Sequence, residues 1–285
     1  MLYCMRTLTF LTLLAIGMAP IGAKAETLRP MDLHLVMSMG GLTAGSLMLS
    51  IDPKDDRIES VLKMKSQGLF KFVTGYKSRA EAKSTPEING KGPMPVSYDT
   101  TYETKNTERK VSIRYDAGDG QITDLKTWKR GKPRKSKVPE ELRLETIDPL
   151  TAVLQLRHWI REMREAETGK IGENVSDSRA FEIFDGRRRY RLSAELLSRR
   201  RVTFDGEKTP ALRFKVLMEP LAGFSKKDML ANWASEDGKR WIEMVVTDDD
   251  DPLPISLTTK GGTLKTSVYL RKVCINGAKC RKVDS

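Results

Sequence analysis

Hydrophobic and polar residues alternate along most of this chain, and turn-forming dipeptides separate the alternating segments. The first example is residues 31–39, MDLHLVMSM, which Gly40-Gly41 joins to residues 42–51, LTAGSLMLSI. Alternation with a period of two places successive side chains on opposite faces of a strand, and a glycine pair favours a tight turn. We therefore predict a β-hairpin at this point.

The same pattern recurs to the end of the chain. Asp-Gly or Asn-Gly, which favour hairpin turns, occur at 89–90, 119–120, 185–186, 205–206, 237–238 and 276–277. Further strands are predicted at residues 57–66, 95–104, 109–116, 121–130, 180–184, 187–197, 211–220, 240–248, 254–262 and 264–274. So many short strands indicate a mainly β fold, a curved antiparallel sheet or an incompletely closed barrel with one or two helices packed against it.

Residues 148–167 break the alternation with helical spacing. Asp148-Pro149 supplies an N-cap and a proline at the first helical position, which together mark the start of a helix. The apolar residues that follow recur every three or four positions: Val153, Leu156, Ile160 and Met163. We predict an amphipathic helix.

Residues 67–82, QGLFKFVTGYKSRAEA, are the second candidate helix. At helical spacing Leu69, Phe72, Val73 and Tyr76 would face a sheet. A strand stays open as an alternative because the segment is rich in aromatic and β-branched residues.

Residues 183–192, IFDGRRRYRL, combine a turn signal with four arginines. A two-residue turn at Asp185-Gly186 would pair Phe184 with Arg187, Ile183 with Arg188, Glu182 with Arg189 and Phe181 with Tyr190. Such a register would let Phe184 stack on Arg187 and would place the opposite charges of Glu182 and Arg189 across from each other.

Side chains on the second strand of this hairpin would alternate between two faces. Tyr190 and Leu192 would face the core, whereas Arg187, Arg189 and Arg191 would share the outer face. Arg188 would point toward the core on the same face as Tyr190. Its charge would then have to reach solvent at the rim of the core or pair with a carboxylate. Two interpretations of the outer arginines stay open, a solvated face and a patch that contacts anions.

The N-terminus predicts export. Residues 1–25 combine Arg6, a short apolar stretch and Ala23-Lys24-Ala25, which is the pattern of a cleaved signal peptide, and the apolar stretch is too short for a membrane-spanning helix. Residues 26–285 would then form a single mainly-β domain of the periplasm or cell envelope, without a transmembrane segment. In that oxidising compartment Cys274 and Cys280, which flank Asn276-Gly277-Ala278, are expected to form a disulfide across a hairpin.

The chain is basic, with a formal net charge of +12 and an isoelectric point near 9.5. Export argues against nucleic acid as the partner, so the expected anions are lipid head groups, lipopolysaccharide and wall polymers. Residues 129–137, KRGKPRKSK, are the most basic segment, and we interpret them as an exposed connector.

The sequence offers little for catalysis, and we predict no enzyme, no metal site and no cofactor. The chain has two histidines, of which His34 lies in the first strand and His158 lies on the helix between Arg157 and Trp159, where it is interpreted as a surface residue. Neither belongs to a zinc-hydrolase or nucleophile-elbow motif. The run Asp248–Asp251 suggests calcium, but consecutive carboxylates on an extended segment cannot all converge, so a loop is preferred.

Six segments also resemble a known family, in the order in which the family has them: GGLTAGSLMLSI, MKSQGLFKFVTGYKSRAEAKS, PVSYDTTYE, DPLTAVLQLR, FDGRRRYRL and EPLAGF. This family of exported bacterial proteins is catalogued as domain of unknown function 3108. The resemblance implies a β-rich envelope protein and supplies no catalytic residues. The fold that it implies is similar to that of the lipoprotein carriers LolA and LolB, which are curved, incompletely closed β-barrels. The family pattern has cysteines before the Phe-Asp-Gly turn and before Pro-Leu-Ala-Gly, where this chain has none.

These observations favour a non-catalytic envelope protein whose curved sheet offers an apolar concavity to a lipid or a lipidated partner such as a lipoprotein. A structural helix could also fill that concavity. The protein would then be a docking module for an envelope or wall partner without a small ligand. A hydrolase of envelope substrates is the remaining alternative.

Overall fold

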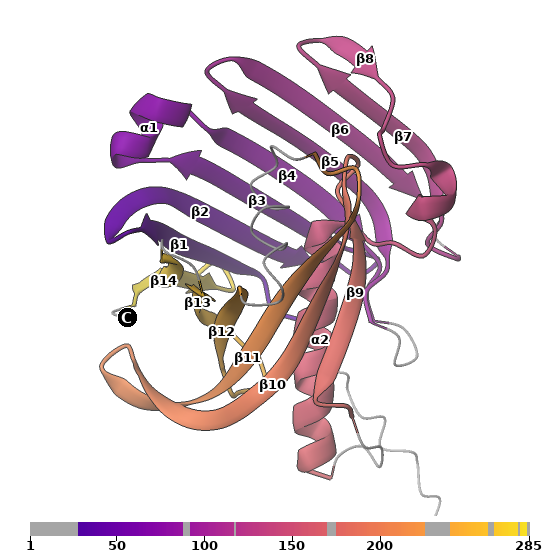
Figure 1. Ribbon diagram of the computed structural model, residues 1–285. Coiled ribbons are helices and arrows are strands. Elements are labelled where there is room, and N and C mark those ends of the chain that lie inside the picture. The colour runs from indigo at the N-terminus through magenta and orange to yellow at the C-terminus, as the bar shows by residue number, and fades with distance from the viewer. Residues whose placement is uncertain are drawn as a thin grey trace, which may run out of the picture.

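A single curved sheet surrounds a long helix in the computed structural model (Figure 1). The structure describes residues 28–87, 92–116, 118–169, 175–225, 240–261, 265–278 and 280–283. Neighbouring strands of the sheet are antiparallel throughout. No helix among the described residues is long and apolar enough to span a bilayer.

The strand order follows the chain in two runs. The first run is β1 (Met31–Met39), β2 (Leu42–Pro53), β3 (Ile58–Ser66), β4 (Lys77–Ser84), β5 (Pro95–Thr104), β6 (Thr107–Tyr115), β7 (Ile122–Lys129) and β8 (Lys132–Arg134). The second run is β9 (Ser178–Phe184), β10 (Arg189–Phe204), β11 (Glu207–Ala222), β12 (Trp241–Thr247), β13 (Pro254–Lys260) and β14 (Thr266–Ile275), with β15 (Arg281–Lys282) paired to β14. Pairing of β1 with β14 joins the runs, and β8 and β9 end the order. The described strands thus form an antiparallel sheet that is not closed into a barrel, which confirms the predicted fold class.

The helices are α1 (Gly68–Thr74) and α2 (Pro149–Glu167), with a short 3-10 helix at Glu140–Arg143. The prediction of a helix over residues 67–82 is only partly right, because α1 ends at Thr74 and β4 follows. Its apolar side chains were expected to face a sheet, and this is wrong, since Leu69, Phe72 and Val73 are exposed.

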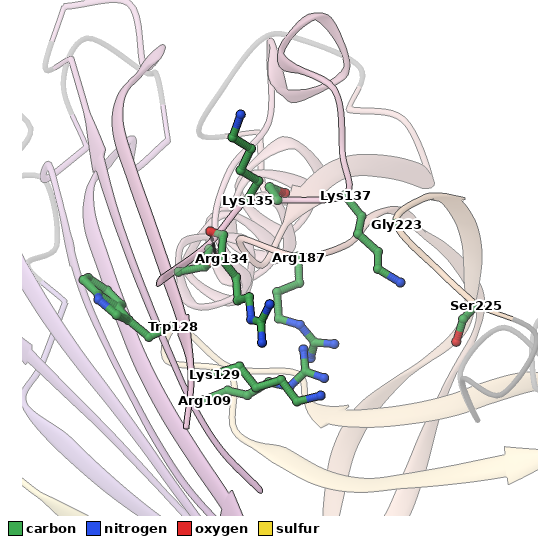
Figure 2. A pocket seen from close by; sticks show the side chains of 11 residues that line it. Arg109, Trp128, Lys129, Arg134, Lys135, Lys137, Arg187, Gly223 and Ser225 are labelled. Carbon is green, nitrogen blue, oxygen red and sulfur yellow. Dashed lines mark hydrogen bonds between the residues drawn. The ribbon is translucent and has the colours of Figure 1, made fainter. Parts of the chain in front are cut away.

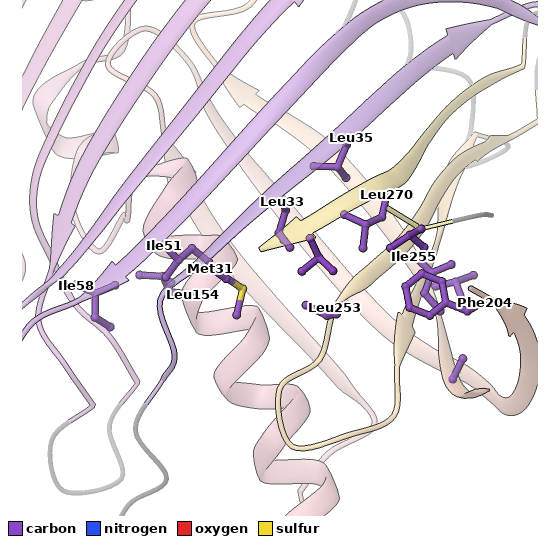
Figure 3. Packing of buried hydrophobic residues seen from close by; sticks show 14 residues of the cluster. Met31, Leu33, Leu35, Ile51, Ile58, Leu154, Phe204, Leu253, Ile255 and Leu270 are labelled. Atoms are coloured by element: carbon purple, nitrogen blue, oxygen red, sulfur yellow. The ribbon is translucent and has the colours of Figure 1, made fainter. Parts of the chain in front are cut away.

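Helix α2 occupies the middle of the concave side and packs against both runs of strands. Leu154 shares a buried cluster with Met31 and Ile51 of the first run (Figure 3). Further along the helix, Trp159 stacks with Phe214 of β11 at 5.5 Å between ring centroids. The helix therefore acts as the core onto which the sheet folds.

The start of α2 is confirmed, because the Asp148 carboxylate accepts the backbone N–H groups of Leu150 (2.9 Å) and Thr151 (3.0 Å). Strands surround the helix, so its buried residues extend beyond one apolar stripe and include Arg157 and His158. The interpretation of His158 as a surface residue is wrong.

The C-terminal hairpin carries the predicted disulfide. β14 and β15 pair Lys272 with Lys282 and Val273 with Arg281, so the next pair in register is Cys274 with Cys280. Their sulfurs are bonded, with the Cα atoms 4.1 Å apart, which confirms the prediction. Val283, which follows β15, is buried in the core cluster that Leu154 also joins.

Reduction of this disulfide is expected to lower the free energy of unfolding by about 2 kcal/mol, because the released chain end gains conformational freedom. Urea unfolding with and without dithiothreitol measures the effect. The double variant Cys274→Ser/Cys280→Ser should match the reduced protein and should not respond to reductant. Equal stability of the oxidised and reduced proteins would show that the bond adds nothing to the hairpin.

Candidate functional site

The turn between β9 and β10 is longer than predicted. Residues 185–188 form the loop, and Phe184 pairs with Arg189, Ile183 with Tyr190, Glu182 with Arg191 and Phe181 with Leu192. The two-residue register at Asp185-Gly186 is therefore wrong. Its physical reason is that the Asp185 carboxylate accepts the backbone N–H groups of Arg187 (2.8 Å) and Arg188 (2.7 Å), which stabilises the wider turn.

A shift of two residues leaves the side chains on their predicted faces, since the period of a strand is also two. Tyr190 and Leu192 pack against the buried cluster of Phe181 and Ile183. Glu182 lies on the opposite face with Arg189 and Arg191. The predicted faces of residues 189–192 are confirmed. The prediction that Arg187 shares the outer face is wrong, because Arg187 belongs to the turn and not to the strand, and its side chain lies over Tyr102 on the inner side.

The four-residue turn presses against the first run of strands. A Cβ atom added to Gly186 would lie 2.1 Å from a methyl carbon of Val111 on β6, and Gly186 has a φ of +86°. Phe184, directly before the turn, is fully buried in a cluster with Tyr98 of β5 and Ile113 of β6. The turn follows β9, which ends the strand order, and this contact places Arg187 and Arg188 next to the inner face of β5 and β6, near the opposite end of the order.

Arg187 extends over Tyr102 of β5. Its guanidinium carbon lies 5.5 Å from the ring centroid, and the guanidinium also donates a hydrogen bond to the Tyr102 hydroxyl. The predicted stacking of Arg187 on Phe184 is thus replaced by stacking on an aromatic residue of a distant strand. Arg188 takes a different direction, with its guanidinium carbon 5.5 Å from the ring centroid of Phe224.

Arg187 also lines a cavity of about 440 Å³, which we call the basic cavity. β6, β7, β8 and the segment after β8 form its walls. Its cationic lining residues are Arg109, Lys129, Arg134, Lys135, Lys137 and Arg187. Among the described residues that line the cavity there is no carboxylate, and the charged ends of Arg109, Lys129, Arg134 and Arg187 gather together (Figure 2).

The titration of these groups reflects their crowding. The positive charge of Arg109 lowers the pKa of Lys129, and desolvation together with Arg130, Arg134 and Arg187 adds to the effect. Burial lowers the pKa of Arg187, and the charge of Arg109 lowers it further. Cations that repel one another at short range create a strong attraction for an anion.

A second cavity, of about 340 Å³, lies on the inner face of β3 to β6, and we call it the apolar cavity. Most of its lining is apolar or aromatic: Leu62, Met64, Tyr76, Ala80, Tyr98, Tyr102 and Val111. Ser78, Thr100, Asp185, Arg187 and Arg188 complete it. Arg187 lines both cavities, so a hydrophobic surface and a cationic surface adjoin at one side chain.

The three arginines predicted to contact anions are in different surroundings. Arg187 lies at the junction of the two cavities. Arg189 and Arg191 both form ion pairs with Glu182, at 3.2 Å and 2.6 Å. Arg191 also forms an ion pair with Glu219 at 3.2 Å. Arg189 and Arg191 therefore form a neutralised network on the outer face.

Sequence reasoning did not assign the basic segment 129–137 to a site. It contains the last residue of β7, the β7–β8 turn, all of β8 and the three residues that follow β8. Thr127 of β7 donates its hydroxyl to the Arg134 carbonyl at 2.7 Å. Most of the segment is exposed, as predicted, but it is more than a connector, because residues 132–134 form β8 and this pairing holds them against the sheet next to Arg109 and Arg187. The sequence did contain a sign of this site, because residues 129–137 carry six lysines and arginines and no aspartate or glutamate.

The remaining candidate residues do not assemble with the cavities. His158 lies 3.0 Å from Glu87 and 3.2 Å from Glu162, and it lines a separate cavity of about 520 Å³. The described residues that line this cavity include no serine, threonine or cysteine, which are the nucleophiles that a histidine base could activate. His34 lies on β1, opposite Met48 and Lys272.

The aspartates of residues 248–251 do not converge on one point. Arg157 pairs with Asp251, Arg164 with Asp250 at 3.3 Å, and Arg199 with Asp248 at 3.1 Å. No group of three or more potential metal ligands occurs among the described residues. This segment ties α2 and β10 to the loop after β12.

Comparisons with known proteins find one family model and a solved structure of similar architecture, both described as of unknown function. No curated protein matches the chain. A solved structure from Brucella abortus, titled a beta-barrel-like protein of domain of unknown function DUF1849, is 14% identical with a TM-score of 0.47, over 87% of this chain and 98% of that chain. Residues 34–268 match the family model described as "Protein of unknown function (DUF3108)", and the chain belongs to this family.

Proposed function

We propose that this protein is a non-catalytic binding protein of the bacterial envelope that holds an amphiphile with an anionic head group. The single observation that carries the proposal is the position of Arg187, which lines the basic cavity on one side and the apolar cavity on the other. A phosphate or carboxylate head would bind among the cations, and its hydrocarbon tail would lie along the inner face of β3 to β6.

Both halves of this arrangement favour retention of such a ligand. Burial of the tail against Leu62, Met64 and Val111 removes apolar surface from water. An anionic head relieves the repulsion among Arg109, Lys129 and Arg187. A ligand without the hydrocarbon tail would lose the burial of apolar surface, and a ligand without the anionic head would lose the attraction to the cations.

The size of the apolar cavity limits the ligand. About 340 Å³ lies at the lower end of the range for small-molecule sites, and α2 already fills the middle of the concave side. We therefore propose a single hydrocarbon chain or one chain of a larger lipid, which includes the acyl chain of a lipoprotein.

Export is part of the proposal. The signal-peptide pattern of residues 1–25, which lie outside the described residues, and the Cys274–Cys280 disulfide both support a periplasmic location. The outer membrane and the inner membrane supply anionic amphiphiles to that compartment.

A docking module without a small ligand is the second candidate. The observation that favours it is the packing of α2, whose Leu154, Trp159 and Ile160 fill much of the concavity. In that case the basic cavity would receive an acidic group of a partner protein or of a wall polymer, and the apolar cavity would stay without a ligand.

Isothermal titration calorimetry with dodecyl phosphate, below its micelle concentration, tests the proposal. Dodecyl maltoside, which has the same tail and a neutral head, and inorganic phosphate are the matched controls. We expect dodecyl phosphate to bind at least about tenfold more tightly than either control, and we expect added salt to weaken its binding. Binding of inorganic phosphate with equal affinity would favour the docking module, and absence of binding by all three would contradict the proposal.

A further inference from the structure

Helix α1 presents an apolar surface to solvent. Leu69, Phe72 and Val73 are 64%, 74% and 69% exposed, and α1 has no buried residue. Leu42, at the start of β2, is 59% exposed. These four make up half of the large hydrophobic side chains that are exposed in the described part of the chain, so the patch is a concentration and not a scattering of single residues.

The helix is fixed in this orientation by its neighbours. Gln67 donates its backbone N–H to the carbonyl of Ala44 on β2 at 2.9 Å. At the other end, the Lys105 backbone N–H donates to the Thr74 carbonyl at 3.2 Å, and the Lys105 ammonium donates to the carbonyl of Phe72. The apolar side chains are therefore held outward by hydrogen bonds to two hairpins.

Positive charge predominates on and beside the patch, where Glu103, opposite Lys77 across β4 and β5, is a neighbouring carboxylate. Residues 60–80 contain four lysines and one arginine but no carboxylate. Arg79 pairs with Glu81, whereas Lys71 on α1 and the nearby Lys65 and Lys77 have no ion pair with a described carboxylate. An apolar surface with a rim of lysines is complementary to an anionic bilayer, where apolar groups enter the head-group region and lysines contact phosphates.

The patch lies at the same end of the sheet as the basic cavity. The β5–β6 turn contacts α1 through Lys105, and through Asn106 it accepts hydrogen bonds from Arg130 in the β7–β8 turn, at 3.1 and 2.6 Å. Arg109 and Lys129, which line the basic cavity, are paired neighbours just inside these two turns. Figure 1 shows α1 and both turns along one end of the sheet.

We propose that α1 docks this protein on an anionic lipid bilayer, with Leu69, Phe72 and Val73 inserted among the head groups and the surrounding lysines against lipid phosphates. The end of the sheet that carries the basic cavity then faces the membrane. The protein binds the bilayer surface without crossing it. This inference does not depend on a ligand in either cavity.

Cosedimentation of the purified chain with lipid vesicles tests the inference. Vesicles of phosphatidylethanolamine and phosphatidylglycerol supply the anionic surface, and vesicles of phosphatidylcholine supply the neutral control. Phe72→Gln should lower the partition coefficient on anionic vesicles about tenfold, since it removes one inserted aromatic side chain. Lys71→Gln should lower it less, and only on the anionic vesicles.

Leu144→Gln is the matched control, because Leu144 is 53% exposed and belongs to the segment after the 3-10 helix, away from α1. Its vesicle binding should equal that of the unmodified protein, and circular dichroism should show all three variants folded. Equal binding by Phe72→Gln, or binding to neutral vesicles as strong as to anionic vesicles, would overturn the inference. So would self-association that Phe72→Gln abolishes, which would assign the patch to a second copy of the chain, or failure of the unmodified protein to bind either vesicle.

Arg187→Gln separates this inference from the proposed function. This variant should keep its vesicle binding while its affinity for dodecyl phosphate falls. Phe72→Gln should show the opposite combination.

Discussion

Replacement of Arg187 by glutamine is expected to weaken the binding of dodecyl phosphate about tenfold or more. Among the described residues, Arg187 is the one cation that lines both cavities, and its guanidinium also stacks on Tyr102. It can therefore contact a phosphate where the head group meets the tail. A hydrogen bond to a charged group contributes about 1.5–3 kcal/mol, which corresponds to a tenfold to hundredfold change in affinity. Calorimetric titration of the variant measures the loss.

Arg191→Gln removes the same charge from a position on β10, close to the turn that carries Arg187, and serves as the control. Arg191 pairs with Glu182 and Glu219 on the outer face, away from the cavities. Its affinity for dodecyl phosphate should stay close to that of the unmodified protein. Equal losses in the two variants would mean that the overall positive field attracts the ligand and that the basic cavity is not a specific site.

The second large effect is a pH dependence at the start of α2. Asp148 is fully buried, and desolvation raises the pKa of its carboxyl from 3.8 to about 6 although Thr151 and Leu150 donate hydrogen bonds to it. The raised pKa means that the folded protein binds this proton more tightly than the unfolded chain does. The contribution of the protonated Asp148 carboxyl to the free energy of unfolding is therefore complete below about pH 4, and it is lost as the pH rises through about 6.

Asp148→Asn removes the titration and keeps an oxygen that can accept the N–H groups of Leu150 and Thr151. The difference in free energy of unfolding, variant minus unmodified protein, should rise by about 2.5 kcal/mol in favour of the variant between about pH 4 and pH 7. Urea unfolding across that range measures it. A difference that does not change with pH would show that the Asp148 carboxyl titrates as it does in water.

Asp148→Ala serves as the control for the cap itself. It should follow the same pH dependence as Asp148→Asn, but it should be less stable by about 1 kcal/mol at every pH, because the helix loses its capping oxygen.

Local signals were sufficient for much of the fold. Alternation of apolar and polar residues around Gly40-Gly41 predicted β1 and β2, and Asp148-Pro149 predicted the start of α2. The β9–β10 turn was predicted with the wrong length, because an Asp-Gly dipeptide suits both a two-residue turn and the wider loop that the Asp185 carboxylate stabilises. The faces of Tyr190 and Arg191 were nevertheless correct, since the error was an even number of residues.

The candidate site could not be predicted, because it depends on contacts between distant segments. Arg187 and Tyr102 are 85 residues apart in the chain, and the packing of Gly186 on Val111 and of Phe184 in the same buried cluster brings them together. No local pattern distinguishes an arginine that enters a cavity from one that pairs with Glu182. The orientation of α1 was predicted incorrectly for a related reason, since helical spacing identifies an apolar face but does not say whether the core or a partner covers it.

The most direct test of the central claim is native mass spectrometry of the protein purified gently from the envelope of its own cells. We expect a bound species whose mass matches an anionic single-chain amphiphile or an anionic lipid, and we expect Arg187→Gln to lose it while Arg191→Gln retains it. Protein that is consistently free of any bound amphiphile, in the unmodified form as well as in both variants, would contradict the claim that the two cavities form one ligand site.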